Sequence, residues 1–220
     1  MLTRLASVLV SFGLLGSAAT AGSSANAPRP VAHVIDGSIT PDDLRMPVRA
    51  APDRAEVRKA LEKRRAKNLA AFRAYRKAGV YPHNFYRVGP LNVWIDEMGH
   101  LCAAATMISE DGKRQLVLKI GETDNNIRLL NVLDGPLLDW MLTSGFTIEE
   151  IDRIQAPAVM PNERMMKSFE MIQAENARLK KLYAEVDGWL VKRAKTGLDT
   201  ATDRLMSNPD LAWRLLDGTL

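Results

Sequence analysis

The side chains best suited to covalent chemistry in this sequence are Cys102 and the histidines His100 and His83. A catalytic cysteine reacts as a thiolate, which a neighbouring imidazole generates and which a helix N-terminus stabilises by lowering the thiol pKa. Cys102 meets part of this requirement, because the small residues of 103–107 favour a short buried helix that would start beside it. A thiol-dependent enzyme is therefore one hypothesis.

The spacing of these side chains weakens that hypothesis. Residues two apart on a strand point to the same side but lie about 6–7 Å apart, so His100 cannot bond directly to Cys102. His83 or His33 would then have to act as the base. A single cysteine flanked by leucine and alanine is more often a small buried hydrophobe. We therefore predict no catalytic residue, and keep Cys102 with His100 or His83 as the alternative site.

Metal, nucleotide and nucleic-acid chemistry lack the spacings that they require. One cysteine and three histidines, at positions 33, 83 and 100, give no recognisable set of metal ligands. The chain has no glycine-rich phosphate loop. A helix-turn-helix is predicted over 134–155, but its second helix carries three acidic side chains and one arginine, so DNA phosphates would repel it. We predict no bound metal, no cofactor and no nucleic-acid partner.

The N-terminal residues predict where the protein works. Residues 1–4 supply one positive charge, an uncharged run follows as far as Leu15, and 19–21 form a small-x-small ending. This pattern is typical of a secretory signal peptide. We therefore expect a signal peptide over 1–21, cleaved near Ala21, and an exported, soluble product in the periplasm or outside the cell.

The next thirty residues predict a linker rather than a folded segment. Residues 22–52 contain five prolines with scattered serine and glycine, and show no apolar periodicity. We expect a disordered tether there, followed by about 170 residues of one domain that is large enough to bury a core. Because Cys102 is the only cysteine, no internal disulfide can form in an oxidising compartment and stability must come from packing.

Residues 53–79 predict a basic amphipathic helix. Asp53 can cap its start and Gly79 its end, and an apolar stripe follows one face, interrupted by Arg64 and Arg65. This helix has ten basic and three acidic residues, whereas 80–157 has six basic and eleven acidic, so the two segments should attract each other. The alternative is weak contact with an anionic surface through five cations: Arg58, Lys59, Lys63, Arg64 and Lys67.

The segment 80–157 is predicted to be a compact α-rich core with a β-hairpin. Residues 92–96 alternate as a strand does, 96–99 read as a tight turn, and 100–101 could return as the second strand. Short helices are expected over 102–107, 113–122, 135–144 and 148–155. Thr147 and Glu150 predict a capping box for the last of them.

The segment 158–220 is predicted to hold a long helix and two short ones, around 199–206 and 209–216. The long helix has a heptad seam with steps of four and three: Met165, Phe169, Ile172, Asn176, Leu179, Tyr183, Val186 and Leu190. Asn176 is the one polar member, at a position where a buried amide can fix register. We expect this helix to pack against 53–79 in the same molecule; a homodimer through 165–190 is the alternative.

Two stretches of the chain resemble an uncharacterised family of exported bacterial proteins. The first is Asp96-x-x-Gly99-x-x-Cys102-Ala103. The second is D-G-P-L-x-D-W at 134–140, followed by G-x-T-x-E-E at 145–150 and I-Q at 154–155. The resemblance implies a shared domain and no known activity. This chain departs from the family pattern after Ala103, where two alanines replace Val-Gly.

Together these features predict a mainly α-helical domain with a small β-hairpin, bracketed by two long amphipathic helices. Long helices and a charged arm are present, whereas no catalytic set converges in the sequence. The leading hypothesis is therefore a non-enzymatic binding or structural module of the cell envelope. The alternatives are a thiol-dependent enzyme that uses Cys102 and a surface-associating protein that uses 53–79.

Asn176 tests whether the long helix packs within one molecule or between molecules. Asn176→Leu should leave the elution volume on a sizing column unchanged, because a helix that packs inside its own chain does not choose its partner through this amide. A shift to dimer or trimer would instead support the intermolecular seam.

Overall fold

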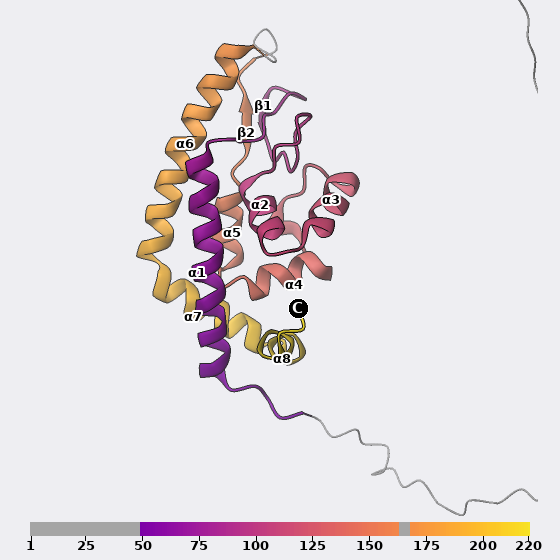
Figure 1. Ribbon diagram of the computed structural model, residues 1–220, viewed down its shortest axis with the longest axis vertical. Helices are drawn as coiled ribbons and strands as arrows, with labels where there is room; N and C mark the ends of the chain where they lie inside the picture. The colour runs from indigo at the N-terminus through magenta and orange to yellow at the C-terminus, as the bar shows by residue number, and fades with distance from the viewer. Residues whose placement is uncertain (1–48, 163–167) are drawn as a thin grey trace, which may run out of the picture. The chain divides into compact units, whose positions relative to one another are not determined.

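The computed structural model describes residues 49–162 and 168–220, and the fold is mainly helical, as predicted. The signal peptide predicted over 1–21, most of the predicted tether, His33 and Met165 lie outside the described residues. Two long helices, α1 (Arg54–Ala78) and α6 (Phe169–Lys192), lie side by side, with the shorter elements against them (Figure 1).

The shorter elements follow one another in chain order. They are β1 (Gly89–Leu91), α2 (Ala103–Glu110), α3 (Arg114–Thr123), the 3₁₀ turn η1 (Leu129–Asn131), α4 (Gly135–Thr143), α5 (Ile148–Gln155), β2 (Ala158–Met160), α7 (Ala194–Met206) and α8 (Pro209–Asp217). Helix α7 begins earlier than expected, because the single residue Arg193 makes the turn from α6 into α7. Within the described ranges, no helix combines the length and apolar character needed to cross a bilayer.

Helix α1 begins and ends where the sequence indicates. Asp53 Oδ1 accepts a hydrogen bond from an amide of the first turn at 2.9 Å, and Gly79 closes the helix at φ 68°. Phe72 and Tyr75 of α1 pack edge-on against Tyr183 of α6, with ring centroids 5.7 and 5.5 Å apart. The two long helices therefore pack against each other within one chain.

The buried face of α6 follows the predicted seam only in the second half of the helix. The last four seam residues, from Leu179 to Leu190, are buried as predicted. Phe169, in contrast, is 68% exposed, and Met171 and Glu175 are buried in the first half. A straight helix turns every 3.6 residues, so a stripe with a period of 3.5 drifts around it and only part of the stripe can face one neighbour.

The small sheet differs from the predicted hairpin. The turn at 96–99 forms, with Gly99 at φ 80°, but the residues around it pair only at one bridge between Ile95 and Leu101. The two-stranded sheet joins β1 to β2 instead, antiparallel. The alternating pattern at 92–96 correctly indicates an extended chain, but it does not predict which strands pair. The partner of β1 is β2, which follows α5 and is far away in the sequence.

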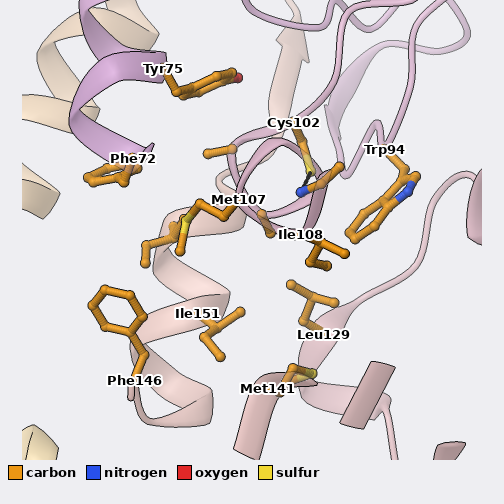
Figure 2. Packing of buried hydrophobic residues seen from close by; sticks show 14 of the residues in the cluster. Phe72, Tyr75, Trp94, Cys102, Met107, Ile108, Leu129, Met141, Phe146 and Ile151 are labelled. Carbon is orange, nitrogen blue, oxygen red and sulfur yellow. Dashed lines mark hydrogen bonds between the residues drawn. The ribbon is translucent and has the colours of Figure 1, made fainter. Parts of the chain in front are cut away.

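The core is centred on α2, the short buried helix that follows Cys102. Its alanines and its residues Met107 and Ile108 are 0% exposed. Large side chains from the surrounding elements close around it: Phe72, Trp94, Leu129, Met141, Phe146 and Ile151 (Figure 2). Small residues in α2 therefore let several elements approach one central helix.

A buried ion pair joins α1 to the rest of the domain. Arg65, which the sequence analysis treated as an interruption of the apolar stripe, is 6% exposed and donates to both carboxylate oxygens of Glu150, at 2.7 and 2.8 Å. It also donates to the carbonyl oxygens of Gly145 and Leu190. Glu150 is 0% exposed and accepts a hydrogen bond from Thr147 N, so the predicted capping box of α5 is present.

Two glycines make room for this ion pair. At Gly145, which has φ 84°, a Cβ would lie 2.3 Å from Leu61 O and 2.7 Å from Arg65 N. At Gly197 of α7, a Cβ would lie 2.5 Å from Glu150 Oε1. A larger residue at either position would displace the backbone of α1 or the buried carboxylate.

Replacing Arg65 tests how much the buried pair contributes to stability. Arg65→Met should lower the free energy of unfolding by about 3–5 kcal/mol, because Glu150 would remain buried without its partner. Chemical denaturation at neutral pH measures this change. Arg54→Met is the matched control on the same helix, since Arg54 pairs with Asp203 at the surface, and its loss should cost at most about 1 kcal/mol. Equal losses of stability in the two variants would contradict the prediction that the buried pair contributes more than the exposed one.

Candidate functional site

The structure places Cys102 in the core. The residue is 1% exposed and caps α2, its Sγ accepting a hydrogen bond from Ala105 N at 3.4 Å (Figure 2). Burial raises the pKa of the thiol to about 12 and outweighs the opposite effect of the backbone amides at the helix start. The thiol is therefore protonated at neutral pH, although it stands at the helix N-terminus that the sequence predicts.

The two histidines considered as partners of Cys102 meet at a carboxylate instead. His100 Nδ1 lies 3.0 Å, and His83 Nδ1 3.5 Å, from Oδ2 of Asp96. One donor atom from each of these three residues lies within 4.8 Å of the other two, and Cys102 is not part of the cluster. The fold thus gathers both histidines around Asp96, a residue for which the sequence predicts only a place in a tight turn.

A tight turn positions Asp96 and His100. Asp96 Oδ1 accepts hydrogen bonds from the backbone amides of Met98 and His100, each at 2.9 Å, and Gly99 has the positive φ at which the chain reverses. Asp96 Oδ2 accepts another from the amide of His83 at 3.2 Å, which ties the segment before β1 to the turn. Three backbone amides therefore hold a carboxylate whose residue is 5% exposed.

His83 lies in the segment between α1 and β1 and is 3% exposed. Its ring stacks on Phe85 with centroids 5.5 Å apart, and its Nε2 lies 3.1 Å from Oδ1 of Asn176 on α6. Its Nδ1 faces Asp96 at the distance of a charge contact and has no hydrogen-bond partner among the described residues. A buried polar atom without a hydrogen-bond partner is energetically costly.

The surroundings of Asp96 keep its carboxyl group ionised. Burial by itself would raise the pKa of this group. Interactions with the His83 and His100 side chains and with the backbone amides of both residues outweigh burial and hold the pKa at about 2. The cluster therefore has a fixed negative charge between two imidazoles.

A groove on the surface reaches the cluster at His100. The groove has a volume of about 420 Å³ and lies between the alanine-rich face of α1, α2 and the turn, with Tyr75, Leu101 and Thr106 among its walls. The His100 side chain is 30% exposed, whereas those of His83 and Asp96 are almost fully covered. A water or small molecule in the groove can therefore approach the cluster on the His100 side.

The basic face of α1 is largely engaged within the chain. Arg58 pairs with Asp199, while Arg64 and Lys67 both pair with Asp111. The other two cations considered for surface contact are exposed lysines that make no ion pair within the part of the chain described. The attraction predicted between 53–79 and 80–157 is thus visible in the two ion pairs with Asp111, whereas Asp199 lies outside that acidic segment.

Comparison of the chain with models of protein families, with curated proteins and with solved structures gives no match. The resemblance drawn from 96–103 and 134–155 therefore stays a prediction. Several residues of these two stretches have structural roles. Asp96 and Gly99 form the tight turn, Cys102 caps α2 and Thr147 caps α5.

Asp96 is the member of the cluster that sequence reasoning missed. A local signal existed, because His100 follows Asp96 by four residues across a predicted tight turn, and such a turn brings its two ends together. His83 offered no comparable signal. It lies thirteen residues before Asp96, and only the packing of the intervening chain brings it to the turn.

Asp96 should stabilise the fold in a pH-dependent way. Folding lowers its pKa from 3.8 to about 2, so its contribution, on the order of 2 kcal/mol, is complete above about pH 5 and is lost as the pH falls through 3.8 towards 2. Asp96→Asn should therefore lower the free energy of unfolding more at about pH 6 than at about pH 3, as measured by urea denaturation.

The matched control is Glu185→Gln, which removes an exposed carboxylate from α6. It should change the free energy of unfolding little at either pH, since an exposed group is screened by solvent. A loss for Asp96→Asn of the same size at both pH values would contradict the link to ionisation.

Proposed function

We propose that the protein is an exported, non-enzymatic binding or structural module of the bacterial cell envelope. The observation that carries this proposal is the place of Cys102, which is buried as the cap of α2, has a pKa of about 12 and lies outside the histidine cluster. A thiol-dependent enzyme needs a thiolate beside an imidazole. The contacts of Cys102 support neither condition.

The use of charged side chains supports the same proposal. Arg65 and Glu150 bond to each other in the interior, and Asp187 of α6 pairs with Arg73 and Arg76 of α1. Side chains held in such pairs fix the helices relative to one another and are not free to turn towards a substrate. The same argument makes surface association through α1 the weaker candidate, because a membrane would have to replace existing ion pairs.

Export is part of the proposal because of the signal-peptide pattern over 1–21, which lies outside the described residues. The single cysteine suits an oxidising compartment, since Cys102 is buried and a buried thiol is shielded from cross-linking with another chain. The described domain therefore needs no disulfide to be stable there.

Alkylation of Cys102 tests the proposal. Native protein at neutral pH should react with iodoacetamide far more slowly than a free thiol does, because the Cys102 thiol is protonated and shielded. After unfolding in urea, labelling should reach one adduct per chain. Mass spectrometry follows the reaction, and every adduct is unambiguous because the chain has one cysteine.

Glu185→Cys provides the matched control, since this position of α6 is exposed. The variant should gain one adduct quickly in the native state, while Cys102 stays protected. Rapid labelling of native wild-type protein would overturn the proposal and favour the thiol-dependent enzyme.

A further inference from the structure

Going beyond this proposed function, we infer that His83, Asp96 and His100 form a binding site for a divalent transition-metal ion, with Zn²⁺ the best fit. The spacing of the three histidines in the sequence matches no ligand pattern and predicts no metal. The inference rests on the geometry of the three side chains and on one buried nitrogen that lacks a partner.

Two of the three distances between donor atoms are close to those that a small cation requires. A tetrahedral zinc ion bonds nitrogen and oxygen at about 2.0–2.1 Å, which places two ligand atoms about 3.3 Å apart. The Nδ1 atoms of His100 and His83 lie 3.0 and 3.5 Å from Asp96 Oδ2. The donor atoms of all three residues lie within 4.8 Å of one another, and rotation of the partly exposed His100 ring would bring them closer.

The hydrogen bonding of His83 aims a lone pair at Asp96. Nε2 lies 3.1 Å from Asn176 Oδ1 and donates to it, so in the neutral ring Nδ1 carries the lone pair. This lone pair faces Oδ2 of Asp96 at 3.5 Å in a buried place. Two such acceptors repel each other unless a cation lies between them.

The distance between these acceptors favours a metal ion over a proton. A protonated His83 would donate a charge-assisted hydrogen bond to Asp96, and such bonds measure about 2.7–2.9 Å. The observed separation is 3.5 Å, and Nδ1 makes no hydrogen bond with the residues described. That separation is too long for the charged hydrogen bond and close to the spacing of two ligands on one ion.

The donor set selects the class of metal. Two imidazoles and one carboxylate suit Zn²⁺ and its neighbours Co²⁺, Ni²⁺ and Cu²⁺, whereas Ca²⁺ and Mg²⁺ prefer oxygen ligands alone. Three protein ligands leave one position of a tetrahedral ion open. His100 lines the groove described above, so a water or an external donor in the groove would approach the ion from the His100 side.

The neighbours of the cluster hold its ligands in place. Asn176 fixes the tautomer of His83, Phe85 stacks on its ring, and backbone amides orient Asp96. Histidines that bind metals commonly use their second nitrogen in this way. Asn176 is thus a positioning residue: the polar member of the predicted seam bonds to His83 of its own chain.

Metal titration of the untagged protein tests the site. After a chelator has removed bound metals, calorimetric titration with Zn²⁺ should show one ion per chain. Asn176→Leu should weaken zinc binding by about 10–100-fold, because it removes only an outer hydrogen bond. His83→Gln and His100→Gln should each weaken it further, because they remove a ligand. The Co²⁺-loaded wild type should show the visible absorption bands of a four-coordinate ion.

His33→Gln is the matched control, because His33 is the third histidine of the chain and lies outside the described residues. This variant should bind zinc as the wild type does, and circular dichroism should show each variant folded. If a variant does not fold, the Co²⁺ bands of the wild type still decide the question.

Two results would overturn the inference. One is a wild-type protein that binds no zinc and shows no such Co²⁺ bands. The other is zinc binding that survives in a folded variant with both His83→Gln and His100→Gln. Neither result changes what the alkylation of Cys102 shows, so the metal site and the proposed function can fail separately.

Discussion

The buried ion pair between Arg65 and Glu150 is the constraint on which the arrangement of the helices depends. Arg65 makes four hydrogen bonds, which join α1 to the turn before α5, to α5 itself and to the end of α6. Glu150 also closes the capping box of α5 and lies against Gly197 of α7. Burying two charges is unfavourable unless such bonds offset the lost hydration. Four helices are therefore positioned by hydrogen-bond geometry as well as by apolar packing.

The basic side chains of α1 pair mainly with acidic side chains of the same domain. Cations of α1 pair with Asp111 after α2, with Asp187 on α6 and with Asp199 on α7. Pairs that remain partly exposed contribute little energy each, but each one favours a single orientation of the helices. A helix that by itself would suit an anionic polymer is in this way matched to acidic groups of its own chain.

Local signals in the sequence were enough to predict most helix bounds. Asp53, Gly79 and the pair Thr147 and Glu150 act on residues within one turn, so their effect can be read from neighbours alone. Arg65 could not be placed in the same way, because its partner lies 85 residues further along the chain. The β1–β2 pairing and the meeting of His83 with Asp96 are also set by the packed domain. The helices can therefore be predicted from the sequence, whereas the long-range contacts that form when the helices pack cannot.

The pairing of β1 with β2 also bears on the order in which the chain folds. Helices α2 to α5 lie between the two strands, and several of them contact near neighbours in sequence. Closing so long a loop costs chain entropy before the strands gain anything from pairing, so local contacts form earlier. The segment with His83 contacts Asn176 of α6, so its contacts also depend on an element that is far from it in the sequence.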